Sequence, residues 1–296
     1  MLSDLRPKCQ NPIEAYFKGV AMNPNLLVSI IERAIEEDVG SGDVTSMWAL
    51  PGNAIARIRM VSHGDGVLAG LAVAEQVFNR INALIGFSPT KLDGDEIANG
   101  DILATVVGPA VSVLTAERVA LNFIRHMSGI ATLTRQYVQA IKGTNAVILS
   151  TRQTAPGLRL IEQWAVQIGG GGIHRAKLDD MVYLRDTHIA LAGSITAAME
   201  RIRAQNSDLE VVIEVKTWAE LDEALALDPN RITLIRWGVQ DIRDAVKWVA
   251  GRVPLEVSGN ISLDNVREIA ETGVDYISVA ELTCHLVPVH IGMEVD

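Results

Sequence analysis

The chain has 296 residues, long enough for a large α/β barrel or for two domains, and its 48% apolar content suits a well-buried core. Its net charge of −10 argues against nucleic-acid binding, which favours basic surfaces. Two cysteines without ligand-like spacing argue against a disulfide framework and a zinc site.

The N-terminal residues lack the apolar core of a signal peptide. The sequence also has no apolar run of roughly 18 residues, the length that a membrane span needs. We therefore expect a soluble cytoplasmic protein.

The first third of the chain predicts one helix followed by a small antiparallel sheet. Apolar residues recur at helical spacing over 25–38, and a turn rich in Gly and Asp follows, in which Asp43 and Thr45 are interpreted as turn-forming residues. Over 54–115, short alternating apolar runs are separated by glycine and aspartate, with one helix at 73–85. This pattern indicates a small α+β domain.

A long helical segment at 115–142, with a break near Ser128 and Gly129, is interpreted as the bridge between two domains. Beyond it, strands are predicted at 147–149, 181–184, 211–215, 232–235, 253–257 and 276–279. Helices are predicted at about 158–168, 193–205, 217–227, 239–250 and 262–272. Six β/α units in series imply a parallel sheet, either a barrel or a doubly wound sheet.

Polar side chains collect at the carboxyl ends of these strands, which in a barrel form one face and favour that architecture over an open sheet. They are Ser150, Arg152, Arg185, Asp186, Glu214, Lys216, Arg236, Glu256, Ser258, Ser278 and Glu281. With Arg159 and Arg175 they predict a cationic face that binds carboxylates or phosphates. The turn Ser258-Gly259-Asn260, before a helix, is a candidate phosphate site.

Four glycines at 169–172 precede His174 and Arg175. Glycine allows positive φ and close approach of a ligand to backbone N–H groups, so the segment is a candidate anion-binding loop. A flexible loop with a solvated histidine and arginine is the alternative. His126 and His188 are interpreted as structural residues more readily than as catalysts.

Several stretches resemble the quinolinate phosphoribosyltransferase family, the carboxylating nicotinate-nucleotide pyrophosphorylases. They lie at 37–46, 114–123, 150–159, 169–175, 178–181, 255–259 and 270–279. The likeness runs in order from about residue 26 to 290, so the chain is identified as a divergent member of that family.

The resemblance implies an α/β protein with an incomplete parallel α/β barrel at 130–284. A smaller N-terminal α+β sandwich domain at 1–129 would include the bridging helix, with the tail 285–296 packing back on it. It also implies a homodimer in which Arg118 is shared across the interface. The family reaction, a step of NAD biosynthesis, transfers phosphoribose from PRPP to the ring nitrogen of quinolinate with Mg²⁺, and loss of CO₂ gives nicotinate mononucleotide.

The resemblance also implies roles for individual residues. Glu214 and Arg185 would be catalytic, with Glu214 the metal or ribose carboxylate. Substrate would be bound by Arg118, Arg152, Arg159, His174, Arg175 and Lys216. Phosphate would be bound by Ser258, Gly259 and Asn260.

The sequence departs from the family pattern at Ser150, Gln153, Arg236, Trp237, Ala280 and Glu281. Gln153 replaces a lysine, and Arg236 replaces a carboxylate, so an internal ion pair between Arg236 and Glu214 is expected. Glu281 would place a carboxylate in the phosphate site, where like charges repel. Three hypotheses remain: an active phosphoribosyltransferase, a diverged paralogue with a carboxylate pocket but a rebuilt or lost PRPP site, and a catalytically silent binding protein.

Overall fold

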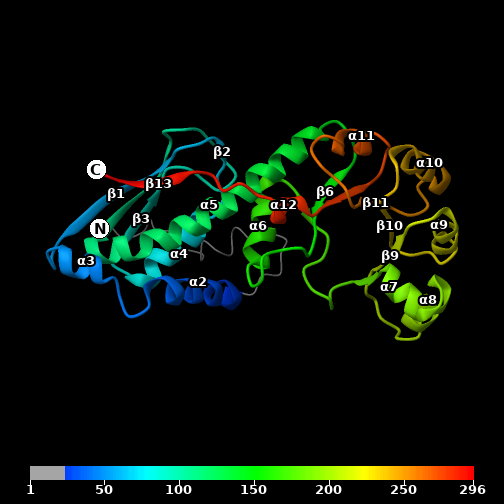
Figure 1. Ribbon diagram of the computed structural model, residues 1–296, viewed down its shortest axis with the longest axis horizontal. Coiled ribbons are helices and arrows are strands. Elements are labelled where there is room, and N and C mark those ends of the chain that lie inside the picture. The colour runs from blue at the N-terminus through cyan, green and yellow to red at the C-terminus, as the bar shows by residue number, and fades with distance from the viewer. Residues whose placement is uncertain (1–23) are drawn as a thin grey trace, which may run out of the picture. The chain divides into compact units, whose positions relative to one another are not determined.

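The computed structural model describes residues 24–296, which form two compact units (Figure 1). The N-terminal unit contains the described residues up to Gly129 together with Pro288–Asp296, and the C-terminal unit contains Ile130–Val287. Residues 1–23, which include Cys9 and the segment interpreted as lacking a signal peptide, lie outside the described part. No helix within 24–296 is long and apolar enough to cross a membrane.

The N-terminal unit is built on a four-stranded antiparallel sheet of order β13-β1-β5-β3. Its elements are α2 (Pro24–Val39), α3 (Val44–Ala49), β1 (Ile55–Ser62), β2 (Gly66–Val67), α4 (Leu71–Ile81), β3 (Gly86–Pro89), β4 (Glu96–Ile97), β5 (Ile102–Pro109) and β13 (Ile291–Val295). Figure 1 shows β13, the last strand of the chain, beside β1. The Asp43 carboxylate accepts the Ser46 N–H at 3.0 Å and caps α3, which confirms its local structural role.

Helix α5 (Ala110–Ala140) is continuous, so the break predicted near Ser128 is wrong. The Ser128 hydroxyl accepts the Ala69 N–H at 2.9 Å and donates to the Ala69 carbonyl. Ser128 is thus a buried attachment point for the loop before α4, and its polar group does not interrupt the helix.

The C-terminal unit is a half-barrel, as expected for an incomplete barrel. Its seven parallel strands have the order β7-β6-β12-β11-β10-β9-β8, with no pairing between the outer strands β7 and β8. The strands are β6 (Val147–Ser150), β7 (Gly172–Ile173), β8 (Val182–Leu184), β9 (Val211–Val215), β10 (Arg231–Ile235), β11 (Leu255–Ser258) and β12 (Tyr276–Val279). The helices are α6 (Arg159–Gly169), α7 (Asp186–Ala192), α8 (Ile195–Arg203), α9 (Trp218–Leu225), α10 (Val239–Val249), α11 (Val266–Ala270) and α12 (Glu281–Cys284).

The core of this unit lies on the interior strands, where Ile213, Leu234 and Ile277 are fully buried. Such near-continuous apolar runs are typical of parallel strands covered on both faces. In Figure 1 helices α9, α10 and α11 follow one another outside strands β9, β10 and β11. The carboxyl ends of the strands are therefore left free to carry a site.

The four-glycine segment terminates a helix and packs closely, so its interpretation as an anion-binding loop is wrong. The N–H groups of Gly170 and Gly171 donate to carbonyls of α6, and Gly172 pairs in β7. A Cβ at Gly169 would lie 2.6 Å from the Ala131 carbonyl oxygen, which no side chain tolerates. The glycines thus end α6 and allow α5 to pack closely against its C-terminal end. Of the segment 169–175, only His174 and Arg175 line the cavity at the carboxyl ends of the strands.

Candidate active site

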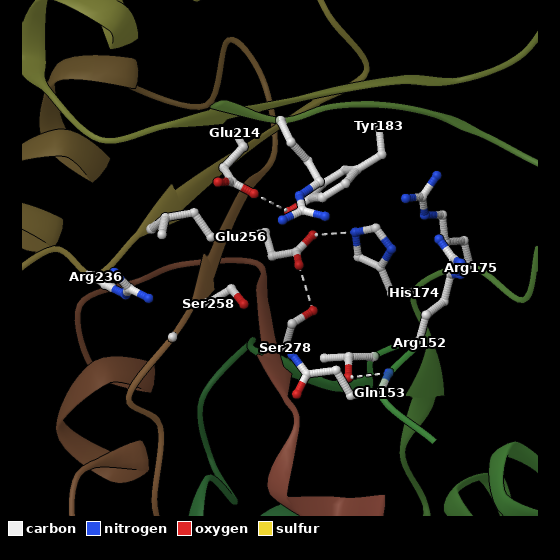
Figure 2. Close-up of a pocket in the computed structure, with 14 residues that line it drawn as sticks. Arg152, Gln153, His174, Arg175, Tyr183, Glu214, Arg236, Glu256, Ser258 and Ser278 are labelled. Atoms are coloured by element: carbon white, nitrogen blue, oxygen red, sulfur yellow. Dashed lines mark hydrogen bonds and ion pairs between the residues drawn. The ribbon is translucent and has the colours of Figure 1, made fainter. Parts of the chain in front are cut away.

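A cavity of about 440 Å³ lies at the carboxyl ends of the half-barrel strands (Figure 2). It is lined by Thr151, Arg152, Gln153, His174, Arg175, Tyr183, Arg185, Glu214, Ile235, Arg236, Glu256, Ser258, Gly259 and Ser278. Every strand of the sheet contributes at least one of these residues, either from its last positions or from the loop that follows. The cavity is therefore a direct product of the parallel topology.

Guanidinium groups dominate the charge of the cavity. Burial, followed by the nearby charge of Arg152, lowers the pKa of Arg175. The Arg175 guanidinium lies 5.0 Å from the centre of the Tyr183 ring and donates to the Met181 carbonyl at 3.4 Å. The Nε atom of Arg152 is buried without a hydrogen-bond partner among the described residues. Crowded, partly unsatisfied cations of this kind favour binding of an anion.

Glu256 is a buried carboxylate beneath the cavity, with 1% of its surface exposed. Its Oε2 atom lies 3.2 Å from His174 Nε2 and 3.1 Å from Arg231 Nη1, and its Oε1 accepts the Ser278 hydroxyl. Burial would raise the pKa of Glu256, but the contacts with His174, Ser278 and Arg231 outweigh it and hold that pKa below the ordinary value. Glu256 therefore stays ionised and fixes the orientation of the His174 imidazole.

Glu214 is a second carboxylate at the cavity, and its Oε2 accepts the Tyr183 hydroxyl at 3.4 Å. Burial, followed by the negative charge of Asp186, raises the pKa of Glu214. The expected ion pair between Arg236 and Glu214 is wrong, because no such contact forms between these two described residues. Figure 2 shows the Arg236 and Glu214 side chains apart, with no dashed line between them.

Three of the predicted substrate-binding residues do not line the cavity. Arg159 donates to the Thr154 hydroxyl and to the Ala176 carbonyl, both at 3.1 Å, so it holds two loops together. Lys216 forms an ion pair with Asp186. Arg118 is an exposed residue of α5 in the N-terminal unit.

The predicted phosphate-binding turn is only partly at the cavity. Ser258 and Gly259 line it, whereas the Asn260 carbonyl accepts the Asn265 side chain at 2.8 Å. Glu281 lies outside the lining, and its carboxylate accepts the Tyr137 hydroxyl from α5. The expected like-charge repulsion in the phosphate site therefore has no counterpart in this geometry.

The other altered positions do not lie together: Gln153 is at the cavity, and the remaining ones are elsewhere in the unit. Gln153 lines the cavity, while Ser150 is buried and Ala280 precedes α12. The Trp237 indole donates to the Val215 carbonyl at 3.2 Å and meets the Trp218 ring edge-on, with centroids 5.1 Å apart. Trp237 thus anchors the loop after β10 outside the cavity.

Sequence reasoning missed Tyr183, and it placed Glu256 and Ser278 on the binding face without individual roles; all three line the cavity. Strand alternation puts Glu256 on the same face as Ser258, two residues later, which agrees with the placement of both at the cavity. His188, interpreted as structural, accepts the Arg185 backbone N–H on Nδ1 at 3.1 Å at the start of α7.

Comparison with known proteins decides the family. The model of the quinolinate phosphoribosyl transferase C-terminal domain matches residues 130–294, and that of the N-terminal domain matches 43–128. The chain belongs to the quinolinate phosphoribosyltransferase family. It is 37% identical to the chloroplastic nicotinate-nucleotide pyrophosphorylase (carboxylating) of Arabidopsis thaliana, over 91% of this chain and 83% of that protein.

Other members of the family agree along nearly the whole chain. The protein of the same name from Mycobacterium leprae is 38% identical over 89% of this chain and 95% of its own length. The crystal structure of nicotinate-nucleotide pyrophosphorylase from Ehrlichia chaffeensis superposes with a TM-score of 0.89, covers 94% of this chain and 100% of that one, and is 37% identical. Nothing in these comparisons favours a diverged or silent protein over a pentosyltransferase.

The magnesium ion implied for the quinolinate phosphoribosyltransferase family would need substrate oxygens to complete its coordination in this cavity. Within residues 24–296, no group of three or more His, Cys, Asp or Glu side chains could hold a metal ion. Glu256 is committed to His174, Arg231 and Ser278, which leaves Glu214 as the cavity carboxylate with a free oxygen. Magnesium in proteins is usually bound by one or two carboxylates together with substrate phosphates and water, so Glu214 is the residue that would hold it, and the ion would offset phosphoryl charge there.

Proposed function

We propose that this chain transfers the phosphoribosyl group of PRPP to the ring nitrogen of quinolinate and forms nicotinate mononucleotide. A bond forms between the ring nitrogen and C1 of the ribose while the C1–O bond to pyrophosphate breaks. One ring carboxylate then leaves as CO₂, and its electron pair on the ring carbon takes a proton. The observation that carries the proposal is the cluster of Arg152, His174 and Arg175 in a cavity of a chain with this family membership.

The Arg152, His174 and Arg175 side chains bind the two carboxylates of quinolinate in this proposal. Guanidinium groups match carboxylate geometry and form strong charge-assisted hydrogen bonds. The unpartnered Nε of Arg152 supports this role, because a buried donor without an acceptor is costly unless a ligand supplies one. Glu256 acts as a positioning residue, since it fixes His174 and does not itself face the ring carboxylates.

Glu214 and Arg185 serve the transfer step. As the C1–O bond breaks, positive charge develops on the ribose, and a nearby carboxylate stabilises that charge. Glu214 lines the cavity and supplies this carboxylate, while the Arg185 guanidinium balances the negative charge that moves onto pyrophosphate. The cavity walls orient the two substrates for reaction, which lowers the entropic part of the barrier.

The direct test is product analysis. Purified protein with PRPP and quinolinate forms nicotinate mononucleotide, detected by mass spectrometry, and Arg175→Ala abolishes most of this activity. Arg243→Ala is the matched control, because Arg243 is on α10 and hydrogen-bonds Gln240 away from the cavity. Absence of the product from folded wild-type protein, with no binding of quinolinate, would overturn the proposal.

We also propose that the protein acts in the cytoplasm as a homodimer in which Arg118 completes the cavity of the partner subunit. The exposure of Arg118 and the family pattern support this role. Arg118→Ala and Arg175→Ala each lose most of their activity at low quinolinate concentration. Mixing the two variants then restores activity, because one site of the mixed dimer carries both intact residues. If the subunits exchange in the mixture and activity is not restored, the shared site is contradicted.

A further inference from the structure

Tyr183 lies in the middle of β8, an outer strand of the half-barrel, and its side chain lines the cavity. It is opposite Val212 of β9, and Glu214 follows two residues later on the same face of the sheet. The Tyr183 hydroxyl donates to Glu214 Oε2 at 3.4 Å (Figure 2). A tyrosine hydroxyl is protonated at neutral pH, so it supplies a donor that an apolar side chain at this position could not.

The ring of Tyr183 contacts two successive residues of the cluster proposed to bind quinolinate. His174 meets it edge-to-face, with ring centroids 5.0 Å apart and an angle of 81° between the planes. The guanidinium carbon of Arg175 lies over the ring, 5.0 Å from its centroid. Edge-to-face aromatic pairs and cation–π contacts are both favourable in this geometry. One ring therefore restrains both the imidazole and the guanidinium.

The other contacts of these two side chains do not replace the ring. Arg175 donates to the Met181 carbonyl at 3.4 Å, which is long for a hydrogen bond. Glu256 holds His174 through Nε2, and the edge-to-face contact with Tyr183 restrains the tilt of the imidazole plane as well. Removal of the ring would thus loosen both substrate-binding side chains while their backbone stays in place.

Glu214, at the other end of the tyrosine, is a buried carboxylate surrounded by charge. Asp186 and Arg185 face it from the start of α7, and Lys216 faces it from the end of β9. The hydrogen bond from Tyr183 engages Oε2, which restricts the rotation of the carboxylate and leaves Oε1 for a substrate. A carboxylate that is already oriented needs less rearrangement in the transition state.

We propose that Tyr183 is a positioning residue that links the quinolinate-binding cluster to Glu214. Its ring places His174 and Arg175 for the quinolinate carboxylates, and its hydroxyl orients Glu214 for the transfer step. The inference rests on the proposed function and adds a residue to it. Because the ring acts on binding of one substrate and the hydroxyl acts on the rate of transfer, mutation can separate the two effects.

The test compares Tyr183→Phe, which keeps the ring, with Tyr183→Leu, which removes both the ring and the hydroxyl. In isothermal titration calorimetry of the full chain with quinolinate, Tyr183→Phe binds within about twofold of wild type, and Tyr183→Leu binds at least about fivefold more weakly, because both ring contacts are lost. In steady-state kinetics Tyr183→Phe lowers kcat about 3- to 10-fold without changing KM for quinolinate, the effect of one net hydrogen bond. A purely structural role for Tyr183 would not separate binding from rate in this way.

Tyr276→Phe is the matched control, because Tyr276 begins β12 and its ring stacks on Arg231 outside the cavity lining. This variant leaves quinolinate affinity and kcat unchanged, and melting temperatures show which variants are folded. Equal quinolinate affinity of wild type and folded Tyr183→Leu, equal loss of affinity in Tyr183→Phe and Tyr183→Leu, or an unchanged kcat of Tyr183→Phe would overturn the proposal. If Tyr183→Leu does not fold, the kinetics of Tyr183→Phe decide alone.

The two measurements also separate this role from the proposed function. If quinolinate affinity differs between Tyr183→Phe and Tyr183→Leu as expected but wild type forms no nicotinate mononucleotide, the proposed function fails and the role of the ring stands. If wild type forms the product and both variants behave as wild type does, the proposed function stands and the role of Tyr183 fails.

Discussion

Replacing Glu256 by Gln removes the charge that holds the His174, Arg231 and Ser278 side chains in place. The variant keeps the shape of the side chain but leaves Arg231 and His174 without their carboxylate, at positions where their side chains are 14% and 9% exposed. Breaking a buried ion pair by removing one partner typically costs about 3–5 kcal/mol. Because Gln retains an oxygen for Ser278, we expect the lower end, about 3 kcal/mol of the free energy of unfolding.

The effect depends on pH in a defined direction. The pKa of Glu256 is held below its reference value of 4.5, so its charge stabilises the folded state above that pH. As the pH falls through the lower pKa of the folded state, the carboxylate is protonated and the contribution disappears. The difference in stability between wild type and Glu256→Gln is therefore largest near neutral pH and shrinks below pH 4.5.

Urea denaturation at several pH values measures this difference. Glu271→Gln is the matched control, because it breaks an exposed pair with Arg267 and is expected to cost less than about 1 kcal/mol. The reasoning would be refuted if Glu256→Gln were as stable as wild type at neutral pH, or if its loss in free energy of unfolding did not depend on pH.

The remaining predictions concern substrate binding, the catalytic carboxylate and packing. Arg175→Ala raises KM for quinolinate by about 10- to 100-fold, because a charge-assisted hydrogen bond contributes about 1.5–3 kcal/mol; an unchanged KM in steady-state kinetics would contradict its role. Burial and the charge of Asp186 raise the pKa of Glu214, so activity falls on the acid side with a midpoint above 4.5. Asp186→Asn moves that midpoint to lower pH, since removal of a negative neighbour favours the ionised form, and a pH–rate profile without this shift argues against Glu214 as the titrating group. Gly169→Ala lowers the free energy of unfolding by about 1–3 kcal/mol through overpacking against the Ala131 carbonyl. A melting temperature of the variant equal to that of wild type would contradict this close contact.

The sequence predicted the strands that position the site because their β-branched runs are strong local signals. All six predicted strands of the half-barrel occur, and their carboxyl ends bring Arg152, Glu214 and Ser258 to one cavity. The two-residue strand β7 escaped prediction, because its glycine carries no side-chain signal. Pairing order between distant strands is also absent from any local pattern, so the barrel and the open sheet could not be separated by periodicity.

Partners of individual side chains were the least predictable feature. Arg236 and Glu214 lie at the ends of adjacent strands, which suggested an ion pair, but the left-handed backbone at Arg236 directs its side chain elsewhere. Glu281 likewise bonds Tyr137, a residue far away in the sequence. Such choices depend on backbone dihedrals and on distant contacts, and neither can be obtained from residue type alone.

The most direct test of the central claim is the stoichiometry of a single reaction with quinolinate and PRPP. Nicotinate mononucleotide, CO₂ and pyrophosphate are measured together in the same sample. The account predicts that the three products appear in equal amounts, because ring transfer and loss of one carboxylate are parts of one turnover. Pyrophosphate without CO₂, or none of the three products from folded protein, would contradict the assignment of this cavity to a decarboxylating phosphoribosyl transfer.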